Sequence, residues 1–184
     1  PLGGEMAGNA DGSIPAWNGG ITAAPAGYKA GDHHPDPFSG DKVLFTIDKS
    51  NYSQYSGQLS PGMVKMFEVY PDTFKMNVYQ TRRTASYPQH VYDATKKYAT
   101  TAELVTNGNG VKGTAIGIPF PMPQNGLEAI WNHILRYRGV NAKRWGGQAA
   151  PTAGGSYTMI GFDEKMLLKY SDQSATPDEL ADHN

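Results

Sequence analysis

The sequence contains no cysteine, and this absence excludes disulfide bonds, zinc–thiolate sites and cysteine catalysis. Charge of one sign is not in excess either, because the formal net charge is only −1. No overall field therefore draws the chain to nucleic acid or to an anionic membrane. Long apolar runs are absent as well, and none approaches the roughly 18–20 residues of a membrane-spanning helix.

Catalytic signatures are missing too. The sequence has neither a G-x-S-x-G nucleophile turn nor an H-E-x-x-H zinc motif. His133 could act as a general base, but a histidine on the flank of a helix more often makes one structural hydrogen bond. We therefore expect no enzymatic activity, no metal site and no cofactor.

Proline and glycine are abundant instead, with 13 and 22 residues among 184. Their share stays below that of low-complexity chains, so we expect long stretches of ordered loop. We predict an extended arm over 1–42, an α+β domain over 43–170 and a polar tail over 171–184. The chain starts at Pro1, so we expect that a leader has been removed or that the chain is part of a longer protein.

The clearest helix is predicted from Asn125 to Gly139. Asn125 can accept a free backbone N–H of the first turn, and Glu128 lies where the acid of a capping box belongs. Gly139 can adopt the left-handed conformation that ends a helix. The apolar positions follow one helical face, namely Leu127, Ile130, Trp131, Ile134 and Leu135. We expect this helix to cover one face of a sheet.

The remaining elements indicate an α+β fold with an antiparallel sheet, since helices alternate with strands and the chain ends in a hairpin. Helices are predicted over 61–70 and from Pro88 to about Ala99. Strands are predicted over 43–47, 74–79, 111–118, 140–150 and 156–170. The last two strands form the hairpin, with a bend near Gly161.

The segment Asp32-His-His-Pro-Asp36 brings together four side chains that could bind a divalent metal ion. Adjacent side chains of an extended segment point in opposite directions, however, so all four cannot easily converge. We favour a solvated polar loop over a metal site.

Gly108 to Gly113 matches the pattern G-x-G-x-x-G, which binds dinucleotides when a strand precedes it and a helix follows. Here a predicted helix precedes it and a proline-terminated stretch follows. No helix N-terminus is therefore available for a pyrophosphate, and the pattern is better explained as a turn.

A basic cluster interleaved with aromatic residues follows the main helix and consists of Arg136, Arg138, Lys143 and Arg144 with Tyr137 and Trp145. Such a cluster can bind nucleic acid through phosphate contacts and stacking. The near-zero net charge argues against this, and we expect no nucleic-acid partner. The same cluster could also meet an anionic lipid headgroup.

Methionine and aromatic side chains are the last feature of the sequence that suggests a binding site. Methionine-rich surfaces adapt to variable ligands, and pockets for apolar molecules are lined in this way. The alternative is that the same residues form the core. The residues that we predict to line a hydrophobic cavity are Phe67, Phe74, Met76, Phe120, Met122, Trp131 and Ile134.

Several segments together resemble one bacterial family, the "domain of unknown function" family thirteen-twenty-nine. They span positions 7 to 139 in the order found in that family, and the later hairpin is similar as well. The segments are Ala7-Gly-Asn-Ala-Asp-Gly-Ser-Ile-Pro-Ala-Trp17, Asp36-Pro-Phe38, Tyr70-Pro-Asp72, Thr81-Arg-Arg-Thr-Ala-Ser-Tyr-Pro88, Gly117-Ile-Pro-Phe-Pro121, Gly126-Leu-Glu-Ala-Ile-Trp-Asn-His133 and Arg136-Tyr-Arg-Gly139. Members of the family are longer, and this chain resembles their amino-terminal part.

The resemblance implies a periplasmic or outer-membrane-associated protein of a Gram-negative bacterium. The family is thought to be similar to the lipoprotein-localisation factors LolA and LolB, whose curved antiparallel sheet forms a half-barrel closed by helices over a hydrophobic cavity. It further implies an outer-membrane protein and a resistance-nodulation-division exporter as partners. No catalytic residue is implied.

The leading hypothesis is a non-enzymatic carrier or acceptor of a lipid or another apolar molecule. The alternative is an interaction module that docks on an envelope partner and has no ligand of its own. In either case an open strand edge at the hairpin would be prone to association. We expect the remainder of a longer polypeptide, or a second copy, to cover that edge.

Overall fold

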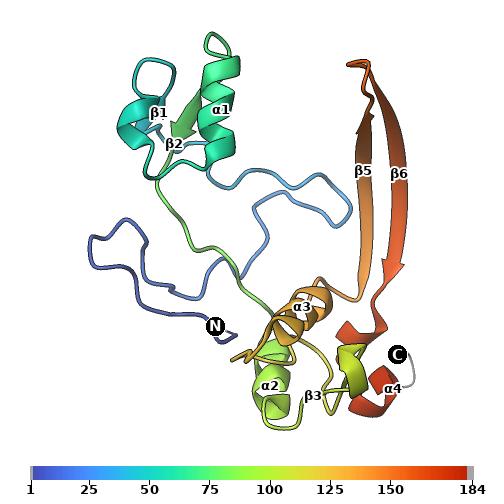
Figure 1. Ribbon diagram of the computed structural model, residues 1–184. Coiled ribbons are helices and arrows are strands. Elements are labelled where there is room, and N and C mark those ends of the chain that lie inside the picture. The colour runs from blue at the N-terminus through green and yellow to red at the C-terminus, as the bar shows by residue number, and fades with distance from the viewer. Residues whose placement is uncertain (1, 182–184) are drawn as a thin grey trace. The chain divides into compact units, whose positions relative to one another are not determined.

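A computed structural model describes residues 2–181, so the first residue of the predicted arm and the last three of the predicted tail lie outside it (Figure 1). The chain forms two compact units. Unit 1 comprises 1–6, 19–22 and 85–184, and unit 2 comprises 7–18 and 23–84. Residues 1–42 therefore contribute to both units. Helices and small antiparallel sheets make up the fold, which confirms the predicted α+β class.

Unit 2 is built around Phe67, which is 1% exposed. The short strands β1 (Phe45–Ile47) and β2 (Met76–Val78) pair antiparallel, and helix α1 (Pro61–Val69) lies between them in the chain. The Phe67 ring stacks on Tyr52 at 5.2 Å and meets Phe74 edge-on at 4.7 Å. Helix α1 begins as predicted, because the Ser60 hydroxyl accepts the Met63 N–H and proline follows the cap.

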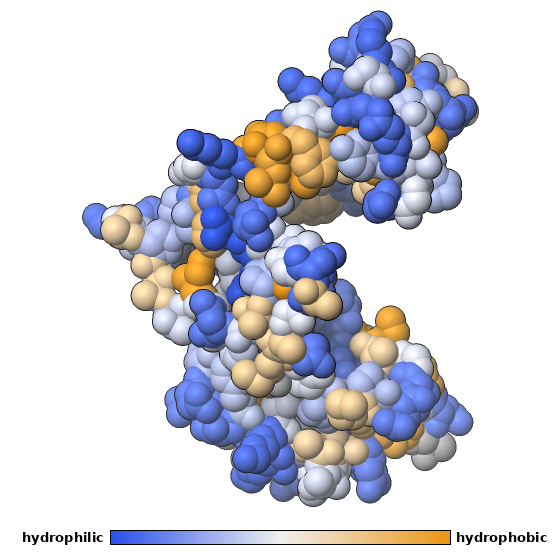
Figure 2. Space-filling model, turned by 90° about the vertical axis from the view of Figure 1, so that its left-hand side faces the viewer, coloured by the Kyte–Doolittle hydropathy of each residue, from blue (hydrophilic) through white to orange (hydrophobic). Residues whose placement is uncertain are grey.

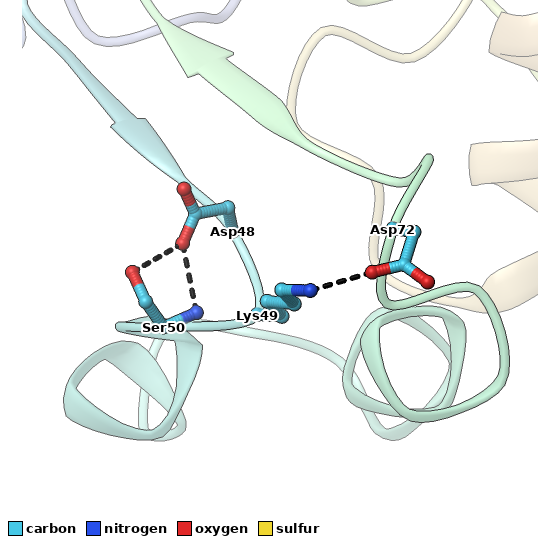
Figure 3. A network of polar contacts seen from close by, with 4 residues as sticks. All are labelled: Asp48, Lys49, Ser50 and Asp72. Carbon is cyan, nitrogen blue, oxygen red and sulfur yellow. Dashed lines mark hydrogen bonds and ion pairs between the residues drawn. The ribbon is translucent and has the colours of Figure 1, made fainter.

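Ion pairs and turns hold the loops of unit 2 (Figure 3). The Asp48 carboxylate accepts the backbone N–H and the hydroxyl of Ser50, at 2.8 and 2.6 Å. Lys49 reaches across to Asp72 at 2.5 Å. These bonds stabilise the ionised acids, so the pKa of Asp48 and that of Asp72 lie below the ordinary value of 3.8.

A guanidinium fork closes a second loop of the same unit. Arg82 donates two hydrogen bonds to the Asp41 carboxylate, at 2.8 and 2.5 Å, and its charge lies 4.2 Å above the Phe38 ring. The hydrogen bonds from Arg82 lower the pKa of Asp41. The next arginine along the chain, Arg83, donates to the Ala7 carbonyl at 3.2 Å and so ties down the first residues of this unit.

Unit 1 has a small apolar core formed by Val91, Ala94, Ala115 and Ile116. Its elements are α2 (Gln89–Tyr98), β3 (Glu103–Leu104), β4 (Val111–Lys112), α3 (Gly126–Leu135), β5 (Asn141–Pro151), β6 (Tyr157–Leu167) and α4 (Pro177–Ala181). The strand predicted over 111–118 stops after two residues, because Gly113, Ile116 and Gly117 all have positive φ. The predicted polar tail contains the short helix α4.

Helix α3 begins as predicted and ends earlier. The Asn125 side chain accepts the Glu128 N–H at 3.0 Å, and the Glu128 carboxylate accepts the Gln124 N–H at 2.6 Å. The prediction that the helix continues to Gly139 is wrong, because the backbone at Arg136 is already extended. Arg136 still donates to the last-turn carbonyl of His133 at 3.2 Å, as a basic residue at a helix end should.

The residues that the structure describes contain three separate two-stranded sheets, β1–β2, β3–β4 and β5–β6. The predicted terminal hairpin is confirmed as β5–β6, with Asn141 opposite Leu167 and Pro151 opposite Tyr157. Its register is uninterrupted, so no bulge produces the bend predicted near Gly161. The predicted single curved sheet remains a prediction. Within residues 2–181 no helix is long and apolar enough to cross a bilayer.

Acid should open unit 2 before unit 1. Hydrogen bonds lower the pKa of Asp11, Asp41, Asp48 and Asp72 in unit 2, whereas among the described residues of unit 1 only the pKa of Asp172 is lowered. A carboxyl with a depressed folded-state pKa contributes its stabilisation above the unfolded value, and loses it as the pH falls below about 4. Hydrogen–deuterium exchange, corrected for intrinsic rates, should show protection lost first around Phe67. Earlier loss around Val91 would contradict this assignment.

Candidate functional site

The β5–β6 hairpin is a long two-stranded ribbon that extends beyond the helices of its own unit (Figure 1). Side chains alternate between its two faces, and the register assigns each residue to one of them. Apart from glycines, the Trp145 face carries Asn141, Lys143, Trp145, Ala149, Pro151, Tyr157, Met159, Asp163, Lys165 and Leu167. The Phe162 face carries Arg144, Gln148, Ala150, Thr158, Ile160, Phe162, Glu164 and Met166.

Both faces expose large apolar side chains. On the Trp145 face the exposed fractions are 53% for Trp145, 67% for Tyr157 and 61% for Met159. On the Phe162 face they are 49% for Ile160 and 43% for Phe162. A two-stranded hairpin is marginally stable alone, and apolar surface of this extent marks a binding site or an interface. The hairpin is therefore the leading candidate site.

Charge is confined to the base of the hairpin. The run from Trp145 to Phe162 contains no charged residue. Below it, Arg144 and Glu164 form an ion pair across the strands, while Lys143 lies 3.6 Å from Asp163 and 4.2 Å from the Trp145 ring centre. This division was not predicted from the sequence, although the uncharged run is its visible signal there.

Glycine occupies the middle of the ribbon. Gly147 lies directly opposite Gly161, and Gly146 is next to that pair. The Gly147–Gly161 pair supplies no side chain to the Trp145 face, and Gly146 supplies none to the Phe162 face. The ribbon can therefore bend more sharply there than a branched sequence would allow. Long strands with a glycine-rich centre suit a strongly curved sheet.

A pocket of about 450 Å³ brings together two of the predicted cavity residues, Phe120 and Met122. Leu104, Ala99, Ala102 and Pro121 add apolar lining, and Glu103, Gln124 and Glu128 add polar groups. Both carboxylates already have partners in this unit, Lys112 at 3.0 Å for Glu103 and the Gln124 N–H at 2.6 Å for Glu128.

The amide of Asn132 fixes the Phe120 backbone at this pocket. Its oxygen accepts the Phe120 N–H at 2.8 Å, and its nitrogen donates to the Phe120 carbonyl at 2.6 Å. The preceding residue, Trp131, donates its indole N–H to the Gly108 carbonyl at 2.9 Å. Helix α3 thus anchors two loops through adjacent residues.

The other predicted cavity residues lie elsewhere. Ile134 is exposed on α3, near Leu127 and Ile130 on the same helix face. Phe67, Phe74 and Met76 belong to unit 2, where Phe67 and Phe74 contact each other in the core. The predicted set is therefore divided between the units, four residues in unit 1 and three in unit 2.

Unit 2 has exposed apolar side chains of its own on α1, at the start of β1 and in the two residues before β1. They are Val43, Leu44, Phe45, Met63, Met66 and Val69. Figure 2 shows the side of the molecule that is on the left in Figure 1. Hydrophilic residues dominate this surface, with a compact apolar patch in the upper half of the view.

A second pocket of about 680 Å³ lies beside the base of the hairpin in unit 1. Val140, Leu167, Tyr170 and Leu180 line it together with charged residues, including Lys169 and Asp172. Because this pocket is lined by both apolar and charged residues, the hairpin is the better candidate in this unit for binding an apolar molecule.

The weaker sequence patterns have structural roles. Asp32 accepts the Lys29 N–H at 3.1 Å, Asp36 caps the Phe38 N–H at 2.8 Å, and the His34 ring packs edge-on against Tyr28. Across residues 2–181 no group of three potential ligands could hold a metal ion. The glycine pattern from Gly108 to Gly113 begins in the turn between β3 and β4 and includes β4, and no helix follows it directly.

Comparison with known proteins places the chain among relatives that are longer. A family model described as "Protein of unknown function (DUF1329)" matches residues 46–184. "Uncharacterized protein PA3922" of Pseudomonas aeruginosa is 44% identical over 179 residues, which cover 97% of this chain. The chain spans only 39% of that relative's length. No solved structure matches the chain.

Removing the Asn132 amide should loosen the pocket. Asn132→Ala leaves a half-buried N–H and carbonyl of Phe120 without their partner, which we expect to lower the free energy of unfolding of unit 1 by ~1–3 kcal/mol. The matched control is Gln124→Ala, which removes an exposed amide that donates to the Met122 carbonyl, and we expect it to change stability by less than ~0.5 kcal/mol. Thermal or denaturant unfolding measures both. Equal losses of unfolding free energy in the two variants would show that the Asn132 hydrogen bonds stabilise the unit no more than the exposed bond of Gln124 does.

Proposed function

Given that the chain belongs to the DUF1329 family, we propose that it binds a lipid or another apolar molecule and passes it on without chemical change. The observation that carries the proposal is the hairpin, whose two faces both expose large apolar side chains. Apolar contact is a sufficient means of holding such a cargo, because burial stabilises it by ~25 cal/mol per Å². No acid–base or nucleophile set in the sequence suggests a reaction.

We assign the cargo to the Phe162 face. Arg144 and Glu164 neutralise each other at its base, and above them Ile160 and Phe162 lie among small or uncharged residues. A micromolar affinity corresponds to about −8 kcal/mol, and this needs roughly 300 Å² of apolar contact before the entropic costs of binding. Several side chains must therefore act together, and the pocket at Phe120 and Met122 is a further candidate contact in the same unit.

The proposal includes a half-barrel like that of LolA and LolB. Its support is the glycine-centred ribbon and the absence of a third strand beside it among the described residues. In a protein as long as the Pseudomonas relative, further strands would extend the hairpin into a curved sheet. The Phe162 face would then line the concave side, with helices closing the cavity.

The family resemblance supplies the setting of the proposal, which is the periplasm or the outer membrane of a Gram-negative bacterium. An outer-membrane protein and a resistance-nodulation-division exporter are the proposed partners. A second candidate function is an envelope interaction module without its own ligand. The observation in its favour is that two apolar faces exceed what one cargo molecule would cover.

Ile160 and Met159 allow a matched test, because these neighbours on β6 point to opposite faces and are similarly exposed. We expect Ile160→Glu to weaken binding of the apolar fluorophore N-phenyl-1-naphthylamine about tenfold or more, since a charge on the cargo face must lose its water. Met159→Glu should leave the affinity within about twofold, because its carboxylate stays in water. Fluorescence titration of the two folded variants gives both values. Absence of fluorophore binding by the unsubstituted protein would favour the interaction module.

A further inference from the structure

The Trp145 face of the hairpin remains unused by the cargo proposal, and we propose that it docks on the surface of an anionic lipid bilayer. The inference concerns membrane contact and stands whether or not the chain carries cargo. It rests on the kinds of residue on this face and on the charge of the segment around it.

The side chains of the Trp145 face are those that favour a membrane–water interface. Trp145 and Tyr157 combine an apolar ring with a polar group, and such residues gather at the level of the lipid headgroups. Met159, exposed by 61%, adds an apolar side chain between them. Lys143 and Lys165 lie at the base of the same face, where long basic side chains can reach phosphate groups while their stems lie along the apolar surface.

Charge distinguishes this part of the chain from the rest. From Arg136 to Asp172 there are six lysine and arginine residues against three acidic ones, a formal charge of +3 in a chain of net charge −1. The remainder of the chain therefore carries −4. The hairpin itself carries +1, and the rest of the excess comes from Arg136, Arg138 and Lys169 against Asp172, which flank its base in the chain. Basic groups beside an apolar face are attracted by anionic headgroups, so the local sign matches an anionic bilayer although the overall sign does not.

Backbone geometry limits how deep the hairpin can enter. The Leu168 N–H donates to the Val140 carbonyl at 2.7 Å, and the Thr152 N–H donates to the Ser156 carbonyl at 2.9 Å. Along an antiparallel pair, residues whose backbone groups bond across to the other strand alternate with residues whose backbone groups point outward. The backbone groups of Tyr157, Met159 and Gly161 therefore point away from β5, and no strand of the described chain lies beside them.

Unpaired backbone groups are not tolerated in hydrocarbon but are satisfied by water and headgroups. The hairpin should therefore lie in the interface and not span the bilayer. With 11 residues in each strand, it is roughly 36 Å long, at about 3.3 Å per residue. Lying flat, it would present the whole Trp145 face to the membrane and keep the Phe162 face away from it.

The Phe162 face is the weaker membrane candidate. It has no tryptophan or tyrosine, and its two charged residues, Arg144 and Glu164, cancel each other. The Trp145 face has two lysines, Lys143 and Lys165, against the single acid Asp163, which pairs with Lys143. A protein partner could also cover the apolar side chains of the Trp145 face. Such a partner would not explain why lysines lie on the same face as Trp145 and Tyr157, whereas a headgroup layer would. Sequence and geometry together favour lipid.

The test is sedimentation of the intact chain with vesicles of equal parts phosphatidylethanolamine and phosphatidylglycerol, and with phosphatidylcholine vesicles. We expect binding to the anionic vesicles, weakened by salt and about tenfold lower on phosphatidylcholine. Met159→Glu should weaken binding to the anionic vesicles about tenfold, and Ile160→Glu should leave it within about twofold. This is the reverse of the order expected for the fluorophore, so the two proposals can fail separately.

Tryptophan fluorescence provides a second readout. A brominated lipid in the anionic vesicles should quench part of the emission, and Trp145→Phe should remove that part, leaving the signal of Trp17 and Trp131. Three results would overturn the proposal: no binding to anionic vesicles, quenching unchanged by Trp145→Phe, or loss of binding in Ile160→Glu but not in Met159→Glu. Lipid-free self-association abolished by Met159→Glu would also overturn it, since the face would then join two copies.

Discussion

The constraint on which the account depends is that a two-stranded ribbon cannot bury both of its faces by itself. In β5–β6 the uninterrupted register places Trp145, Tyr157 and Met159 on one face and Ile160 and Phe162 on the other. Every one of these side chains is substantially exposed. We therefore expect each face to be covered by a binding partner, and the function of the hairpin depends on what these two partners are.

The two faces differ enough in chemistry to suggest different occupants. Charges on the Phe162 face cancel each other, and the side chains above them are uncharged and include the apolar Ile160 and Phe162, as suits a cargo. The Trp145 face combines indole, phenol and lysine, as suits a headgroup layer. A carrier that collects an apolar molecule from a membrane needs both contacts at once, and a ribbon provides them back to back.

The sequence predicted elements whose signals are local. The cap of α3 depends on Asn125 and Glu128, three residues apart, and the terminal hairpin depends on turn residues between two long strands, so both were found. The end of α3 was missed because nothing local shows that Arg136 becomes extended. The strand after Val111 was predicted too long, since the positive φ of Ile116 is held by tertiary packing in a buried segment.

The candidate site was predicted only in part, because the sequence does not distinguish an apolar side chain in a core from one on a binding surface. Phe67 lies in the core of unit 2, and Phe120 and Met122 line a pocket of unit 1. The faces of the hairpin required a register, which the sequence does not contain. The family assignment needed no structure, because its motifs are contiguous.

Mass spectrometry of an organic extract from natively purified protein, prepared without detergent, tests the central claim most directly. A carrier should yield a lipid or another apolar molecule in near-stoichiometric amount, and the amount should fall in Ile160→Glu. An extract that is empty in repeated preparations, from protein that also fails to bind an added apolar fluorophore, would contradict the account and leave the hairpin as a surface for protein partners.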